Sequence, residues 1–148
     1  MDSIRIDSGS IRLAINDDPD RIIEFNPNDV AWVERFYGLI SDFEAKETEY
    51  KERAARLDED REKDAYGLPK NVGQSIELIK EICVYFREKL DEVFGAGTSQ
   101  KAFGDMNTLY MFEQFLDGIT PYIQNARTGT VEKYTGNRAQ RRASKVMK

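Results

Sequence analysis

The sequence contains no histidine, a single cysteine and four prolines among 148 residues. Without histidine, the chain lacks the side chain that most often serves as a general acid or base near neutral pH and as a metal ligand. The lone Cys83 excludes a disulfide within the chain, and it stands between Ile82 and Val84. We expect it to be a small buried hydrophobe rather than a nucleophile.

Motifs for catalysis, cofactors and metals are also missing. The sequence has no nucleophile elbow, no Walker-type lysine and no carboxylate spacing that would select a metal. The glycines of residues 95–100 resemble a phosphate-binding loop only superficially, and a helix end followed by a Thr98 or Ser99 N-cap explains them better. The acidic cluster at 17–20 is interpreted as a turn, not a calcium loop. We therefore expect a protein that is not an enzyme, with no catalytic residue, cofactor or metal.

No apolar run approaches the roughly 18 residues that a membrane helix needs. The first ten residues lack the basic start and apolar block of a signal peptide. We expect no membrane association and a location in the cytoplasm of the cell that makes the protein.

The charge is divided unevenly along the chain. Residues 126–148 contain seven Lys or Arg against Glu132, a net charge of +6, so the −5 of the whole chain leaves −11 on the other 125 residues. This tail holds few large apolar side chains and is expected to be flexible. Its most basic part comprises Arg138, Arg141, Arg142 and Lys145. Nucleic-acid binding is disfavoured, because the acidic body repels phosphate and the tail offers only Tyr134 for stacking.

Alternating apolar residues at the start of the chain predict β-strands. Ile4 and Ile6 form one short alternation, and Ile11, Leu13 and Ile15 form the next. The turn residues at 8–10 between them favour a β-hairpin of these two segments. A turn at residues 16–20 precedes a further strand at 21–25. The pattern predicts three short antiparallel strands.

A long helix is predicted from Asn28 or Asp29 to about residue 64. Its first half carries an apolar stripe for a core, formed by Val30, Val33, Phe36, Tyr37, Ile40 and Phe43. Its second half is highly charged and keeps a thin stripe of Tyr50, Ala54 and Leu57. Two interpretations stay open: a solvated helix beside an antiparallel neighbour, or a stripe offered to a partner.

Two further helices complete the predicted fold. One spans 72–94 with Val72, Ile76, Ile79, Ile82, Cys83, Phe86, Leu90 and Val93 on one face, and the other starts at 105–107 and is disturbed at 118–121. The fold class is therefore mainly α, an antiparallel three-helix bundle with a small N-terminal β-element, in one domain over residues 1–125. The residues expected to be buried between the helices are Phe36, Ile40, Ile79, Ile82, Phe86 and Leu116.

Three segments carry a resemblance to a known family: IRLAINDDP at 11–19 continuing to IIEFNPNDV at 22–30, FGAGTS to FGD at 94–105, and FLDGITPY at 115–122. Over residues 11–125 the chain resembles the tail assembly chaperone-like proteins of tailed, siphovirus-type phages and prophages of Gram-positive bacteria. The resemblance implies a non-enzymatic assembly factor that binds the tape measure protein, keeps it soluble and helps to recruit tail tube subunits. It would act in the bacterial host cytoplasm and be absent from the mature virion.

The apolar stripes indicate where such a partner would bind. We expect contacts at Phe43, Tyr50, Ala54 and Leu57, with Tyr110, Phe112 and Phe115 as further candidates. The alternative function is a structural virion component of the tail or head-tail connector, whose strand edges between Ile4 and Ile15 would pair with neighbouring subunits. Self-association stays open under both interpretations.

Overall fold

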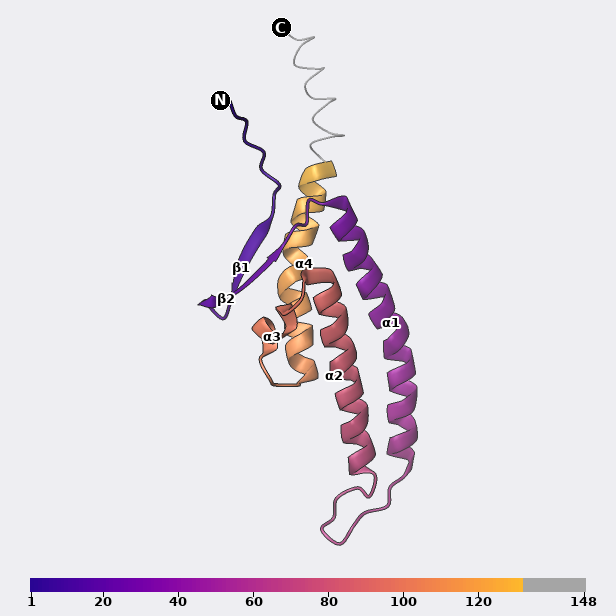
Figure 1. Ribbon diagram of the computed structural model, residues 1–148. Coiled ribbons are helices and arrows are strands. Elements are labelled where there is room, and N and C mark those ends of the chain that lie inside the picture. The colour runs from indigo at the N-terminus through magenta and orange to yellow at the C-terminus, as the bar shows by residue number, and fades with distance from the viewer. Residues whose placement is uncertain (132–148) are drawn as a thin grey trace.

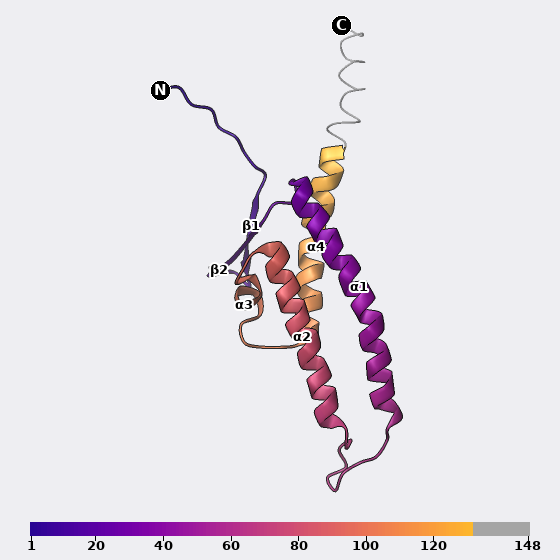
Figure 2. The same cartoon turned by 45° about the vertical axis from the view of Figure 1, so that its right-hand side comes forward.

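The computed structural model describes residues 1–131 of the chain, and the side chains of residues 1–126 (Figure 1). The elements in order are β1 (Ile11–Ile15), β2 (Asp18–Phe25), α1 (Val30–Glu59), α2 (Val72–Phe94), α3 (Thr98–Phe103) and α4 (Leu109–Val131). The long helices α1, α2 and α4 pack side by side, and the β-hairpin and α3 lie beside α4 and the C-terminal end of α2 (Figures 1 and 2). The predicted class, mainly helical with an N-terminal antiparallel β-element, is confirmed.

The β-element is a hairpin of two strands. β1 pairs antiparallel with β2, and Asn16 and Asp17 connect them with φ angles of 52° and 61°. Two consecutive residues with positive φ are typical of the tight turn whose twist matches a hairpin, and Asn and Asp tolerate that conformation. The predicted third strand is wrong, because residues 1–10 contain no strand. Residues with an alternating apolar pattern form a strand only where a neighbouring strand pairs with them. The segment before β1 runs away from the hairpin (Figure 1), so within the described residues Ile4 and Ile6 do not reach a strand with which they could pair.

Helices α1 and α2 form the predicted antiparallel pair. Asp29 caps α1 by accepting a hydrogen bond from the Ala31 amide at 3.0 Å. The ring centroids of Phe43 and Phe86 lie 4.1 Å apart in the middle of the pair. The helix α1 ends at Glu59, some five residues before the predicted end, and residues 60–71 form the connection to α2.

The short helix α3 reverses the chain, so that α4 runs in the same direction as α2. Asp91 of α2 holds the start of α3, because its carboxylate accepts hydrogen bonds from the amide and the hydroxyl of Ser99 at 2.8 and 3.0 Å. Ring contacts show the parallel course: Phe86 stacks on Phe112 at 5.0 Å, and Phe94 meets Phe115 at 5.3 Å. The helix α1 is therefore antiparallel to both α2 and α4.

The helix α4 is longer than its sequence suggests. The disturbance expected at residues 118–121 is absent, since the helix passes through Gly118 and Pro121 and continues to Val131. Packing of this segment outweighs the local cost of a proline within the helix, because Ile119 and Ile123 on either side are buried in the core. The flexible tail is expected from residue 126, but α4 includes residues 126–131. The rest of this tail, with Arg138, Arg141, Arg142 and Lys145, lies outside the described residues.

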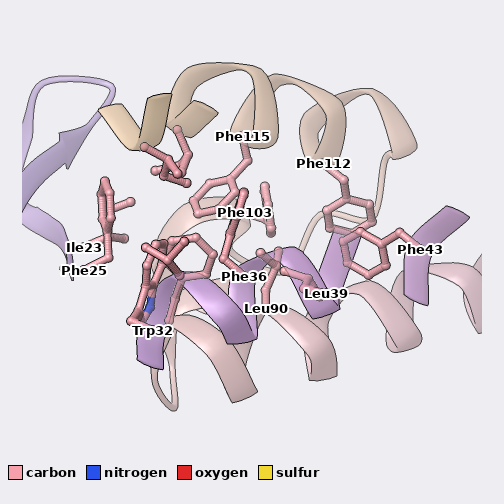
Figure 3. Packing of buried hydrophobic residues seen from close by; sticks show 14 of the residues in the cluster. Ile23, Phe25, Trp32, Phe36, Leu39, Phe43, Leu90, Phe103, Phe112 and Phe115 are labelled. Carbon is pink, nitrogen blue, oxygen red and sulfur yellow. The ribbon is translucent and has the colours of Figure 1, made fainter. Parts of the chain in front are cut away.

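The core is one cluster rich in aromatic residues, drawn from the hairpin and every helix (Figure 3). Phe36 is buried as predicted, while Ile40, Ile82, Phe86 and Leu116 are half-buried at the edge of the core. The cluster consists of Ile23, Phe25, Trp32, Val33, Phe36, Leu39, Phe43, Cys83, Leu90, Phe94, Phe103, Phe112, Phe115, Ile119 and Ile123. The prediction for Ile79 is wrong: this residue is 43% exposed, because no third helix within residues 1–131 covers that part of α2 (Figure 1).

The first helix also buries a face slightly different from the predicted one. Val30 and Tyr37 are exposed, whereas Trp32 and Leu39 are buried. Trp32 donates a hydrogen bond from its indole Nε1 to the Val93 carbonyl oxygen at 2.9 Å. Its polar group is therefore satisfied at the end of α2, which lets the ring enter the core.

Phe112 and Tyr110 offer a matched pair of truncations on α4. Phe112 is 1% exposed and touches Phe86 and Phe103, whereas Tyr110 is 69% exposed. We expect Phe112→Ala to lower the free energy of unfolding by about 3–5 kcal/mol, since it empties a well-packed site. Tyr110→Ala should change it by less than about 0.5 kcal/mol. Urea denaturation of both variants measures the difference, and equal losses would contradict the described packing of α4.

Candidate functional site

One arginine fixes where α4 begins. The Arg87 guanidinium, on α2, donates from Nε to Asn107 Oδ1 at 2.9 Å and from Nη2 to the carbonyl oxygen of Gly104 at 2.8 Å. The same nitrogen also donates to the carbonyl oxygen of Met106, and the guanidinium lies 5.7 Å from the centre of the Phe103 ring. These contacts hold the loop before α4 against the middle of α2, so the third helix starts there.

The pair α1 and α2 extends well beyond that starting point. Both views show α4 alongside only one part of α2, while the rest of the α1–α2 pair continues without a third helix (Figures 1 and 2). A cavity of about 450 Å³ opens where α4 begins. We call it the hairpin groove, after the helical hairpin formed by α1 and α2. It is lined by Ile40, Phe43, Glu44, Lys46, Glu47, Tyr50, Lys51, Ala54, Ile82, Tyr85, Phe86, Leu109, Glu113 and Leu116.

The core stripe of α2 continues past the groove without a cover. Ile79 and Ile76 precede the buried Cys83 by four and seven residues, a spacing that puts the three on one side of the helix. Cys83 is 1% exposed, but Ile79 and Ile76 are 43% and 48% exposed. Val72, one turn further, is exposed as well. The same helix face is therefore core at one end and uncovered apolar surface at the other.

Charges frame the groove on the α1 side. Lys46 lies 5.9 Å from the Tyr50 ring centre and 5.4 Å from that of Tyr85, and it pairs with Glu49 at 3.1 Å. The hydrogen bond with Glu49 raises the pKa of Lys46, and burial raises the pKa of Tyr50. The groove wall therefore carries an ammonium group beside two aromatic rings, with Glu49 as its ion-pair partner.

The structure brings some of the expected partner-binding residues together. Phe43, Tyr50 and Ala54 line the hairpin groove, although Phe43 and Tyr50 are themselves largely buried and form its floor. Leu57 instead lines a smaller cavity of about 270 Å³ with Leu78.

The expected partner-binding residues on α4 differ in their exposure to solvent. Tyr110 is exposed near the start of the helix, whereas Phe112 and Phe115 are in the core and do not form a free surface.

Sequence reasoning missed Ile76 and Ile79 as surface residues. Their three- and four-residue spacing identifies an apolar face, and it gives the same signal whether that face is covered or not. The deciding fact is the starting point of α4, which depends on the contacts of Arg87. No pattern within α2 itself could have indicated it.

A second cavity lies between the hairpin, α3 and α4. Its volume is about 350 Å³, and no charged side chain lines it. We call it the β1 cleft; its lining comprises Leu13, Ala14, Ile15, Asn16, Ile23, Ala102, Phe103, Met111, Gln114, Phe115, Gly118, Ile119 and Tyr122.

The described residues offer little for chemistry. They contain no group of three or more Cys, Asp or Glu side chains placed to hold a metal ion, and none of their buried polar side-chain atoms lacks a hydrogen-bond partner. None of the helices in this part of the chain is both long and apolar enough to cross a membrane. What the geometry does provide is apolar surface in a groove between helices, which suits protein recognition.

Removing the Arg87 guanidinium should loosen the start of α4. Arg87→Met keeps an apolar stem but loses every hydrogen bond to the loop at 104–107. We expect a loss of about 1–3 kcal/mol in the free energy of unfolding, together with faster amide exchange at residues 105–112. Arg56→Met, an exposed position on α1, is the control. Unchanged exchange at 105–112 in Arg87→Met would show that the loop is held by other contacts.

Cys83 should be unreactive in the folded protein. Burial raises the pKa of its thiol, with the Arg87 guanidinium opposing the shift. A folded pKa above the unfolded value of about 8.5 means that the stability contributed by the protonated thiol is complete below that pH and is lost as the pH rises further. We expect slow modification by a thiol reagent at pH 7.5 and a falling free energy of unfolding above about pH 8.5. Rapid modification of the native protein would contradict this burial.

Comparison with curated proteins and with solved structures gives no match to this chain. One protein family does match, over residues 20–145, a range that includes most of β2, all four helices and most of the basic tail. The match covers well over half of the sequence, so the chain belongs to the Family of unknown function (DUF6673).

Proposed function

We propose that this protein is a non-enzymatic tail assembly chaperone of a tailed phage or prophage, and that it binds a helical segment of the tape measure protein. The observation that carries the proposal is the uncovered third-helix position beside α1 and α2. The resemblance of residues 11–125 to tail assembly chaperone-like proteins supplies the identity of the partner. Recruitment of tail tube subunits, action in the host cytoplasm and absence from the mature virion belong to the same proposal.

A helix fits the groove better than an extended peptide does. On one side of the groove, α4 already occupies the position between α1 and α2, with Phe112 stacked on Phe86. A second helix placed end to end with α4 would cover Ile79 and Ile76 as α4 covers Phe86 and Phe94. Such helix-in-groove binding uses apolar anchors at three- and four-residue spacing, which a long helical protein repeats along its length. Each isoleucine removed from water would contribute about 1 kcal/mol or more.

The charges at the groove favour one orientation of a partner helix. Glu44 and Glu113 line the groove and form no ion pair within the described residues, whereas Lys51 is bound to Glu47 at 2.8 Å. A partner with Lys or Arg at the end of its helix near the start of α4 would complement these two carboxylates. Such flanking charges select the register of the partner more than they add affinity.

A structural virion component is the second candidate function. The exposed Ile4 and Ile6 before an open strand edge favour it, because such edges pair with neighbouring subunits. Mass spectrometry of purified particles separates the two functions. The chaperone proposal expects no stoichiometric copy in the mature virion, and a stoichiometric copy would overturn it.

The proposed binding surface can be tested by co-expression with overlapping fragments of the tape measure protein. We expect the wild-type chain to keep at least one fragment in the soluble fraction and to co-purify with it. Ile76→Asp combined with Ile79→Asp should abolish that effect, because two carboxylates would have to be desolvated in an apolar contact. Substitution of Tyr50 is avoided, since this largely buried ring packs against Tyr85 and its loss would disturb the fold.

The matched control is Val84→Asp. Val84 is 54% exposed on the same helix, but its position faces away from the groove. We expect this variant to retain the solubilising effect and all variants to keep a helical circular dichroism spectrum. Equal activity of the double variant and the wild type would show that the partner binds elsewhere, and failure of the wild type with every fragment would overturn the proposed function.

A further inference from the structure

The first seven residues form an extended arm that leaves the body of the protein. Both views show the arm running away from the hairpin (Figures 1 and 2). Ile4 and Ile6 are 83% and 84% exposed, so two large aliphatic side chains stand in water at the period-two spacing of a strand. Side chains at this spacing can fill an apolar cleft beside an open strand edge.

The base of the arm is firmly attached to the body. The Asn26 side chain donates from Nδ2 to the Ser8 carbonyl oxygen at 2.8 Å, and Asn28 Nδ2 donates to the Gly9 carbonyl oxygen at 3.0 Å. Gly9 has a φ of +78°, and a Cβ atom there would lie 2.5 Å from Asn28 Nδ2. The chain therefore turns at a fixed point, and the direction of the arm is set by the body rather than by chance.

The β1 cleft has the shape and polarity to receive such an arm. Leu13, Ala14 and Ile15 of β1 all line this cleft. Successive side chains of a strand point to opposite faces, so Ala14 points away from the face of Leu13 and Ile15. A cleft that all three residues line therefore runs along the edge of β1. β1 belongs to a two-stranded sheet within the described residues, so both of its strands have an open edge. An extended segment can add to an open edge through its backbone while alternate side chains fill the adjacent apolar cleft.

We propose that the arm of one copy of this chain occupies the β1 cleft of a second copy, with Ile4 and Ile6 inserted among apolar residues. A second copy is the occupant because the arm leaves from the Ile11 end of β1, whereas the cleft is lined by residues 13–16 near the hairpin turn. An arm entering its own cleft would have to reverse at its fixed base. When each of two copies inserts its arm into the β1 cleft of the other, both clefts are filled and the pair is symmetric, as is usual for homodimers. This inference rests on the arm and the cleft, and it is independent of the hairpin groove.

Light scattering coupled to gel filtration gives the first test. We expect the wild-type chain to have the mass of a dimer or a higher self-assembly, and Ile4→Asp combined with Ile6→Asp to reduce it to a monomer. Arg5→Asp is the control, because it changes the net charge by the same two units at the alternate face of the arm. A monomeric wild type, or equal dissociation in Arg5→Asp, would overturn the proposal.

Disulfide trapping in a mixture of two chains gives the second test. One chain carries Ile6→Cys with a C-terminal tag, and the other carries Gln114→Cys, at an exposed residue of the cleft lining. We expect a disulfide-linked heterodimer after mild oxidation. Replacing Gln114→Cys by Gln124→Cys, an exposed site on α4 outside the cleft, should abolish it. No heterodimer above that control would overturn the proposal, as would a single chain carrying both substitutions that forms only an internal disulfide.

Discussion

The hydrogen bonds of Arg87 to the loop before α4 are the constraint on which the rest of this structure depends. They tie Gly104, Met106 and Asn107 to the middle of α2, so α4 starts beside Phe86 instead of at the far end of the α1–α2 pair. From that starting point Phe112 and Phe115 enter the core. The same starting point leaves Ile76 and Ile79 of α2 exposed in the part of the chain that the structure describes. One set of polar contacts thus determines both the core and the proposed binding surface.

The two cavities divide the molecule into two places suited to different kinds of partner. The hairpin groove lies between helices, has charged residues along its wall and continues into the uncovered face of α2. The β1 cleft lies along a strand edge and is lined without any charge. A helix suits the first and an extended strand suits the second, because each would satisfy its backbone and bury its apolar side chains there. An assembly factor that associates with itself through one surface and with a helical partner through the other would use both.

Much of the fold could be predicted from the sequence, and the errors have physical causes. The bounds of α2 follow from apolar periodicity and from the glycines after Phe94, and the pairing of β1 with β2 follows from periodicity and from the turn at Asn16. The predicted start of β2 is wrong, because Asp18 to Asp20 belong to the strand and not to the expected turn at residues 16–20. The strand predicted from apolar periodicity at Ile4 and Ile6 is wrong, because an alternating pattern does not show whether a neighbouring strand is available for pairing. Prediction from the local sequence also failed at Gly118 and Pro121, where burial of Ile119 and Ile123 carries the helix through a segment that local propensity disfavours.

Three features follow from the sequence alone: which helix faces are apolar, that Cys83 has no partner for a disulfide within these 148 residues, and that none of these residues is a histidine. They follow from the sequence because they depend on composition or on spacing within one element. The packing of the helices, in contrast, makes the apolar stripe of α2 core at Leu90 and surface at Ile79, and it buries Phe112 while Tyr110 stays exposed. The reason is that burial depends on where a distant element begins, and a side chain of α2, Arg87, fixes the beginning of α4 through contacts that no local pattern encodes.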